Sequence, residues 1–197
     1  MNRFAGVNSA NGDALWYDKE GNLVNECRDE DKVLVGKSFF APWQGGFGTQ
    51  LRWKGLTLST QFSWVADRWM MNNDRYFSES NGTFVNYNQS RKLLYDRWKE
   101  PGDVASVPRH GVAMQLDDRL LEDASFLRWK NLMISYTLPE NLIKPMKFVE
   151  GIRVYAQGQN LLTFTKFQGM DPESSSNMYK AQYPMSRQFS FGMEIQF

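Results

Sequence analysis

The last nine residues restrict the fold of this chain more than any other stretch. From Phe189 to Phe197, apolar residues alternate strictly with Ser190, Gly192, Glu194 and Gln196. Successive side chains of a β-strand point to opposite faces, so this stretch would form a strand with one apolar and one polar face. In a soluble protein a second layer must cover the apolar face, whereas in an outer-membrane barrel lipid covers it. The rest of the sequence has to decide between these two solutions.

Length and composition leave both solutions open. A chain of 197 residues can form one soluble domain. Its mean hydropathy of −0.55 and its lack of any apolar run of about 18 residues exclude a transmembrane helix. They do not exclude barrel strands, because apolar and polar residues alternate in such strands and keep their mean hydropathy low. The aromatic fraction of 15% is high, which suits the aromatic girdles of a barrel as well as a deep soluble core.

The net charge and the numbers of cysteine and histidine residues exclude several classes of function. A net charge of +1 gives no electrostatic argument for a nucleic-acid partner. Cys27 is the only cysteine, so neither an intrachain disulfide nor a cysteine-based metal site can form. His110 is the only histidine, and no catalytic triad or carboxylate pair is legible around it. Acidic residues between 13 and 31 do not have the spacing of a calcium loop. We therefore expect no enzyme activity, no catalytic residue, no metal and no cofactor.

The first part of the chain contains one irregular segment and one clear hairpin. Residues 1–44 are rich in Gly, Asn and Asp, with a small hairpin over residues 14–24, and they lack the apolar segment of a signal peptide, which suggests a chain without its front end. Residues 45–66 form two alternating strands joined by Lys54-Gly55. A two-residue turn there pairs Trp53 with Leu56 and places both apolar sets on one face. Barrels place such tight turns on the periplasmic side.

Residues 67–121 form a long segment without a sustained period. A segment of this length counts against a compact soluble domain and is ordinary for an extracellular loop of a barrel. Its aromatic side chains could stack on sugar rings, or they could pack the loop against itself. The candidates for ligand or partner contacts are Trp69, Tyr76, Phe77, Tyr87 and Trp98.

The strand at residues 122–138 contains a slip in its alternation. Leu127 and Trp129 are apolar at odd positions, whereas Leu132 and Ile134 are apolar at even positions. One extra residue near Lys130-Asn131 would keep both sets on one face, so the pattern predicts a β-bulge there. A straight strand would instead turn cations into lipid at a cost of roughly 2 to 4 kcal/mol each at the midplane.

The remaining segments repeat the alternation of strands and connections. We expect a periplasmic turn at residues 139–150 with a short helical turn at 141–144, a strand at 151–165, an extracellular loop at 166–185 and the closing strand at 186–197. Five strands joined by alternately short and long connections are typical of an outer-membrane barrel. An odd number of strands with open edges cannot close by itself. The sequence therefore predicts an all-β, antiparallel, up-and-down sheet that is the last five strands of a large transmembrane β-barrel.

Several ordered motifs resemble one known family. They are Ser125-Phe126-Leu127-Arg128-Trp129-Lys130-Asn131-Leu132, Ser135-Tyr136-Thr137-Leu138-Pro139, Arg153 to Thr165, Gly169-Met170-Asp171-Pro172-Glu173 and Tyr183-Pro184, preceded by Arg97-Trp98, Pro101-Gly102-Asp103, Pro108-Arg109 and Val35-Gly36-Lys37 before Gly45-Gly46-Phe47. Together they resemble the end of the SusC/RagA family of TonB-linked outer-membrane proteins.

This resemblance implies a plugged barrel of 22 strands in the cell outer membrane. It also implies a SusD-like lipoprotein partner, energy from TonB acting through an amino-terminal part that this chain lacks, and import of oligosaccharides or peptides. Two alternatives stay open, namely a non-transporting outer-membrane barrel such as an adhesin, and a soluble carbohydrate-binding β-sandwich. An upstream plug would distinguish the first alternative from a transporter, and a need for detergent would distinguish the second.

One strand register assigns a side to each residue of the sheet. The lipid-facing set is Leu51, Trp53, Leu56, Leu58, Phe62, Leu132, Ile134, Leu138, Val154, Ala156, Leu162, Phe189, Phe191, Met193 and Ile195. The lumen-facing set is Arg52, Arg128, Lys130, Arg153, Gln157 and Gln159. The terminal aromatic Phe197 resembles the signal by which outer-membrane barrels are recognised for insertion, and we expect its removal to impair assembly.

Overall fold

The computed structural model describes residues 1–197, which divide into two compact units. The strand unit comprises residues 41–68, 124–166 and 183–197. The loop unit comprises residues 1–40, 69–123 and 167–182. Each unit is described by itself below.

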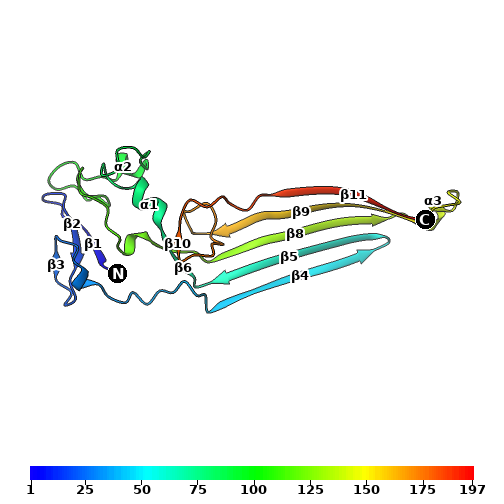
Figure 1. The fold of residues 1–197 in the computed structure, drawn as a ribbon, viewed down its shortest axis with the longest axis horizontal. Coiled ribbons are helices and arrows are strands. Elements are labelled where there is room, and N and C mark those ends of the chain that lie inside the picture. The colour runs from blue at the N-terminus through cyan, green and yellow to red at the C-terminus, as the bar shows by residue number, and fades with distance from the viewer. The chain divides into compact units, whose positions relative to one another are not determined.

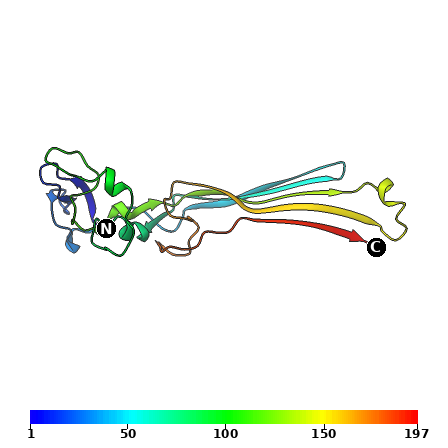
Figure 2. The same cartoon turned by 90° about the horizontal axis from the view of Figure 1, so that it is seen from above.

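The strand unit is one five-stranded antiparallel sheet (Figure 1). Its strands are β4 (Trp43–Trp53), β5 (Leu56–Ala66), β8 (Phe126–Thr137), β9 (Gly151–Thr165) and β11 (Gln188–Gln196), in the order β11-β9-β8-β5-β4. Figure 2, turned by 90°, shows these strands as a single layer. The expected five-stranded antiparallel sheet is confirmed.

The hairpin of β4 and β5 closes as the sequence predicts. Trp53 lies opposite Leu56, and the two turn residues have positive φ angles, 44° at Lys54 and 86° at Gly55. Positive φ at both central residues defines the turn that matches the right-handed twist of the strands. A Cβ atom at Gly55 would lie 2.6 Å from the carbonyl oxygen of Thr137, so glycine is required there for space as well as for conformation.

The β-bulge in β8 is also confirmed. Against β5, Gln61 pairs with Asn131 and Phe62 pairs with Trp129, which leaves Lys130 as the extra residue. The pairing of β8 with β9 shifts at the same level, where Asn131 pairs with Gln159 and Trp129 with Leu162. The helical turn expected after β8 is present as α3 (Glu140–Ile143).

The loop unit contains more regular structure than its sequence indicates. Residues 1–24 form a three-stranded sheet of β1 (Arg3–Val7), β2 (Ala14–Tyr17) and β3 (Leu23–Val24). The β2–β3 hairpin was expected and β1 was not. A second sheet has the order β10-β6-β7 and joins β6 (Trp69–Asn72), β7 (Leu121–Asp123) and β10 (Met178–Tyr179). The segment 67–121 is thus not without regular structure, because β6 and three short helices lie within it.

Short helices complete the loop unit. They are η1 (Asp29–Asp31), α1 (Asn73–Ser78), α2 (Lys92–Tyr95) and η2 (Asp118–Leu120). None of the helices in the structure has the length and apolar character needed to cross a membrane.

The core of the loop unit is small and ties distant segments together. Met70, Leu120 and Tyr179 are fully buried, and Trp16 is almost so. The indole Nε1 of Trp16 donates a hydrogen bond of 2.9 Å to Asp117 Oδ2, across 101 residues of sequence. A buried indole N–H needs such a partner, because leaving it unpaired costs about as much as a lost hydrogen bond.

Candidate functional site

The sheet of the strand unit has one apolar face, built from rows of side chains that the register aligns across the strands. From one end to the other, the rows are Ile152 and Ile195; Trp53, Leu56, Tyr136, Val154 and Met193; Leu51, Leu58, Ile134, Ala156 and Phe191; Thr49, Thr60, Leu132, Gly158 and Phe189; Phe47, Phe62, Trp129 and Leu162; and Trp64, Leu127 and Phe164. Every predicted lipid-facing residue within a strand lies in one of these rows. Leu138, just past β8, continues the ladder through its N–H to the Ile152 carbonyl.

No second layer covers this apolar face. Leu51 is 60% exposed, Ile134 43% and Phe191 80%, although each lies in the middle row of the sheet. A soluble domain rarely leaves a continuous apolar face of this size open to water. The soluble β-sandwich considered above is therefore wrong, since its apolar faces would be packed against each other.

An aromatic stack crosses the sheet at the level of the bulge. The rings of Phe47 and Phe62 are stacked with centroids 5.0 Å apart, and the rings of Phe62 and Trp129 follow at 5.6 Å. The indole Nε1 of Trp129 donates to Thr60 Oγ1 at 2.6 Å and to the Asn131 carbonyl at 3.1 Å. The bulge thus provides Trp129 with an acceptor on its own strand, and the ring is held in one orientation.

The opposite face of the sheet is polar. Five of the residues predicted to face the lumen, Arg52, Arg128, Arg153, Gln157 and Gln159, occupy register positions on this face. Neighbours on the face bond to each other across the strands. Arg153 donates to Ser135 Oγ at 3.2 Å and to Glu194 at 3.3 Å, and Gln157 donates to Asn131 Oδ1 at 3.1 Å. Lys130, the sixth residue, is the bulge residue itself.

The aromatic candidates in residues 67–121 mostly pack against one another. Phe77 contacts Tyr76, Phe84 and Tyr87, with ring centroids between 5.1 and 5.3 Å from its own. The ammonium nitrogen of Lys37 lies over the ring of Trp69, 3.9 Å from the ring centroid. These contacts favour the packing explanation for this group over an open stacking platform, although Tyr87 stays more than half exposed.

Two further candidates have defined surroundings. Trp98 donates from its indole Nε1 to the Ser9 carbonyl at 3.0 Å and fills the space beside Gly12. Phe197 follows β11 and is 82% exposed.

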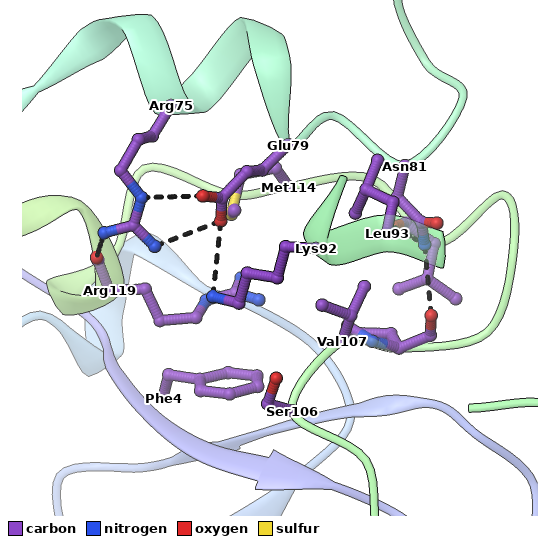
Figure 3. A pocket seen from close by; sticks show the side chains of 12 residues that line it. Phe4, Arg75, Glu79, Asn81, Lys92, Leu93, Ser106, Val107, Met114 and Arg119 are labelled. Carbon is purple, nitrogen blue, oxygen red and sulfur yellow. Dashed lines mark hydrogen bonds and ion pairs between the residues drawn. The ribbon is translucent and has the colours of Figure 1, made fainter. Parts of the chain in front are cut away.

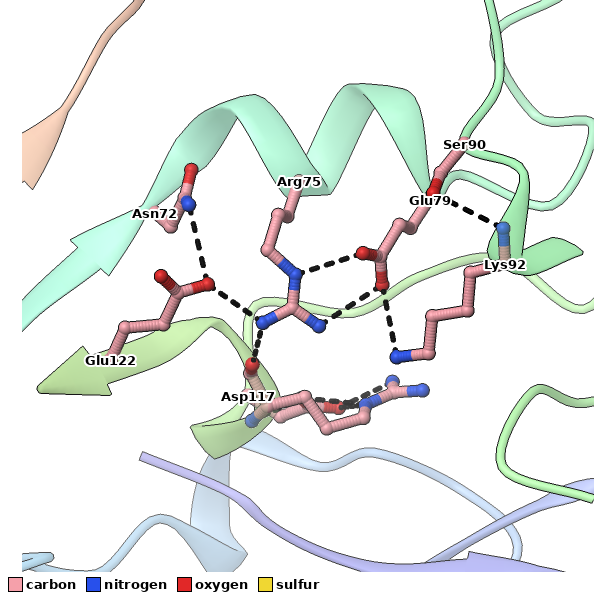
Figure 4. Close-up of polar contacts among 8 residues, drawn as sticks. Asn72, Arg75, Glu79, Ser90, Lys92, Asp117 and Glu122 are labelled. Carbon is pink, nitrogen blue, oxygen red and sulfur yellow. Dashed lines mark hydrogen bonds and ion pairs between the residues drawn. The ribbon is translucent and has the colours of Figure 1, made fainter. Parts of the chain in front are cut away.

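A cluster of ion pairs that the sequence did not reveal lies in the same loop unit (Figure 4). Arg75, on α1, donates to both oxygens of Glu79 at 2.9 and 3.0 Å and to Glu122 Oε1 at 2.9 Å. Lys92 Nζ lies 3.5 Å from Glu79 Oε2. Asp117 pairs with Arg119 at 2.6 Å. The side chains of Arg75, Glu79, Glu122 and Asp117 are each at least 86% buried, so the charges compensate each other away from bulk water.

Burial and ion pairing shift the pKa of Glu79, the central carboxylate of the cluster, in opposite directions. Burial raises the pKa of Glu79, but the hydrogen bonds and charge of Arg75, helped by the charge of Lys92, outweigh it, and the pKa lies below its usual value. In the neighbouring η2, burial raises the pKa of the Asp118 carboxyl above its usual value. Glu79 is therefore held ionised by its partners.

A cavity of about 250 Å³ opens beside this cluster (Figure 3). Its charged lining residues are Arg75, Glu79, Lys92 and Arg119, and its apolar lining residues include Leu93, Val107 and Met114. The guanidinium of Arg119 stacks over the ring of Phe4 at 3.9 Å, which fixes its plane at the cavity wall. Such a mixed lining resembles the walls of small-molecule sites, in which a few placed polar groups accompany apolar surface.

The acidic residues of the first segment form turns and surface ion pairs. Asp18 accepts from the backbone and side chain of Asn22, and Asp29 pairs with Lys32 at 2.7 Å. No group of three or more His, Cys, Asp or Glu residues in the structure has the geometry to hold a metal ion.

Comparison with known proteins gives a consistent result. No protein-family model matches the chain. TonB-dependent receptor P3 of Formosa agariphila is 27% identical over 208 residues, covering 94% of this chain and 19% of that protein. TonB-dependent receptor SusC of Bacteroides thetaiotaomicron is 36% identical over 88 residues, covering 44% of this chain and 9% of SusC. These relatives are named as receptors and not as enzymes.

The structure extends this similarity to the whole chain. A solved structure of the RagAB peptide importer in its open-open state matches with a TM-score of 0.94 and 38% sequence identity, over 100% of this chain and 22% of the matched chain. The closed-closed state of the same importer matches with a TM-score of 0.92. The chain spans about a fifth of the length of the first of these relatives and of the RagAB chain. By sequence and by fold, the chain belongs to the SusC/RagA family of TonB-dependent proteins.

Proposed function

We propose that the strand unit forms part of the wall of an outer-membrane importer driven by TonB. The observation that carries this proposal is the uncovered apolar face of a sheet in which three of the six rows run in register through all five strands. Lipid would cover this face, and the polar face with Arg52, Arg128 and Arg153 would line the barrel interior.

The height of the apolar face agrees with this assignment. From the row of Ile152 to the row of Trp64, the face contains six rows, and β5, which has no extra residue, crosses five of them at intervals of two residues. At about 3.3 Å per residue the rows cover about 33 Å along a strand, and a tilt of about 40° reduces this to about 25 Å. That is about the height of the apolar band of outer-membrane barrels.

The connections support a topology with two different sides. The Lys54-Gly55 turn and α3 join strands at one end of the sheet, and the long connections 67–125 and 166–187 join strands at the other. We assign the first end to the periplasm and the second to the cell exterior. The residues of 1–44, 67–121 and 166–185 would then be extracellular, and the multi-pass protein would meet a SusD-like surface lipoprotein there.

The relatives support one proposal for the substrate class. The RagAB structures, with up to 39% identity, are of a peptide importer, which favours peptides as the cargo. Oligosaccharides are the second candidate. TonB would act on a plug in the part of the protein beyond this chain. An outer-membrane barrel that does not transport, such as an adhesin, is the competing function.

Spin labels on neighbouring residues of β8 test the membrane assignment. In the full-length protein with Cys27 replaced by Ser, a label at Ile134 should collide with oxygen dissolved in lipid, and a label at Met133 should collide with a water-soluble nickel chelate. The two residues are adjacent in sequence and lie on opposite faces of the same strand. Equal accessibility of both labels to the nickel chelate would contradict the proposal.

Uptake measurements test transport separately. A strain without the gene should lose accumulation of labelled peptides, or of labelled oligosaccharides, and regain it with the gene on a plasmid. A strain that keeps all uptake but has the labels of β8 in lipid would favour the non-transporting barrel.

A further inference from the structure

We propose that the cavity of the loop unit binds a small organic carboxylate with an apolar body, held by Lys92 and Arg119. All residues that line this cavity belong to the loop unit. Binding at this cavity does not require that the protein imports anything.

The charges at the cavity favour an anion. Three cations line it, namely Arg75, Lys92 and Arg119, against one carboxylate, Glu79. Both oxygens of Glu79 already accept from Arg75, so this carboxylate has little capacity for a cationic ligand. The compensating carboxylates Asp117 and Glu122 do not line the cavity, although they pair with its arginines. A ligand in the cavity therefore meets more positive than negative charge.

Two of these cations have donors to spare. Arg119 uses Nε and Nη2 on Asp117, which leaves Nη1 for a ligand. Lys92 is 36% exposed and makes only a long contact of 3.5 Å with Glu79, so its ammonium has N–H groups to offer. The guanidinium of Arg75, in contrast, already donates to Glu79, Glu122 and the Arg119 carbonyl. Lys92 and Arg119 are thus the anchors for a carboxylate (Figure 3).

The surrounding contacts hold these anchors in place without a ligand. Arg119 lies between Asp117 and the ring of Phe4, which fixes both its position and its plane. Lys92 begins α2, whose next residue, Leu93, is 5% exposed and anchors the helix. A binding group that is fixed before the ligand arrives loses little entropy on binding.

The apolar lining residues determine the rest of the ligand. Leu93, Val107 and Met114 contribute apolar surface to the cavity, and Val107 is 6% exposed. An inorganic anion would leave this apolar surface uncovered. An aliphatic or aromatic group attached to the carboxylate would cover it and gain about 25 cal/mol for each Å² removed from water.

Binding of two matched probes to the full-length protein in detergent tests the proposal. N-acetyl-leucine has the carboxylate and an apolar side chain, and N-acetyl-leucinamide is its neutral counterpart. By saturation-transfer NMR and calorimetry, we expect the acid to bind at least tenfold more tightly than the amide, since a hydrogen bond between charged groups is worth that factor or more.

Variants locate the binding at this cavity. Lys92→Gln should weaken binding of N-acetyl-leucine at least tenfold, and Lys92→Arg should restore most of it. Lys32→Gln is the matched control, because Lys32 is also an ion-paired lysine of the loop unit but does not line the cavity. It should leave binding unchanged. Equal binding of the acid and the amide, no binding of the acid, or the same affinity in Lys92→Gln as in the unaltered protein would each overturn the proposal. Import activity does not enter any of these readouts.

Discussion

Glu79 is the residue on which the ionic contacts of the loop unit converge. It follows α1 directly, and it accepts from Arg75 on that helix and from Lys92 at the start of α2. Its side chain is 7% exposed, so no water can replace these partners if they are lost. The contacts of this one carboxylate therefore hold two helices of the loop unit in place.

Removing this charge should loosen α1. Glu79→Gln leaves Arg75 with one charged partner instead of two, and breaking a buried pair costs about 3 kcal/mol. Amide exchange of α1 in the full-length protein should become roughly a hundredfold faster. Glu140→Gln is the control, because Glu140 is 87% exposed and pairs with Lys144 at 3.7 Å. A surface pair of this kind contributes about 0 to 1 kcal/mol, so exchange in α3 should barely change. Equal effects of the two substitutions would contradict this assignment.

The same carboxylate should make the loop unit sensitive to acid. The pKa of Glu79 lies below its ordinary value of 4.5 in the folded state. Its contribution is therefore fully present above about pH 4.5 and is lost as the pH falls through the lower, folded-state pKa. The half-buried Asp118 has the opposite sign, because its raised pKa stabilises the folded state at low pH and stops doing so as the pH rises.

Exchange of α1 amides between pH 7 and pH 3, corrected for the intrinsic rates, measures the Glu79 contribution. Protection should fall at the acid end in the unaltered protein and should change less in Glu79→Gln. The same acid dependence in both proteins would show that another group is responsible.

At the level of single residues, the sequence predicted well where the reason for a residue is local. The bulge at Lys130 follows from a change of parity within β8 alone. The ion cluster could not be predicted, since Arg75 and Glu122 are 47 residues apart and neither has a local pattern that indicates the other. For the aromatic candidates, only the structure shows that rings such as Tyr76 and Phe77 pack against each other.

Among the elements, β8 gives the sharpest prediction. Lys130 is the extra residue relative to β5, so its deletion leaves Trp129 opposite Phe62 and Asn131 opposite Gln61. The remaining strand alternates regularly, and every apolar side chain keeps its face. A full-length protein lacking Lys130 should therefore still assemble, as judged by its heat-modifiable migration on a gel.

Deletion of Ser59 from β5 is the contrasting change. No extra residue lies near Ser59 on its own strand, so the deletion shifts part of β5 by one position and turns its apolar side chains to the polar face. This protein should not reach the folded form. If both deletions abolish assembly equally, Lys130 is not a spare residue of the ladder.

The long strands of the sheet could be predicted from the sequence, whereas the short strands of the loop unit mostly could not. Strands of the sheet alternate over nine to fifteen residues, and this long period is enough to define both faces. The strands of the loop unit are shorter, and β1, with Arg3, Phe4 and Gly6, has no clear alternation. It is held by pairing with β2 and by the bond from the Phe4 N–H to Asp118, 114 residues away. Such an element depends on its tertiary neighbours more than on its own residues.

For the whole molecule, insertion into the membrane should depend on which face receives a charge. Leu58 and Ser59 are neighbours on β5, but Leu58 lies in the middle apolar row and Ser59 opposite Met133 on the polar face. Leu58→Arg should reduce the amount of folded protein in the outer membrane, because an arginine in lipid at mid-depth costs about 2 to 4 kcal/mol. Ser59→Arg should insert normally. Similar amounts of folded protein for both variants would contradict the assignment of the apolar face to lipid.

The connections of the sheet also set the order in which its strands can find each other. Two residues separate β4 from β5, thirteen (138–150) separate β8 from β9, and fifty-nine (67–125) separate β5 from β8. Each doubling of the loop length adds about 0.6 kcal/mol to the entropic free-energy cost of closing the loop. The step from thirteen to fifty-nine residues therefore adds about 1.3 kcal/mol. The β4–β5 hairpin should nucleate first and the β8–β9 pair next, while the junction of β5 with β8 forms late. That late junction would make the fifty-nine-residue connection the slow step in folding this part of the chain.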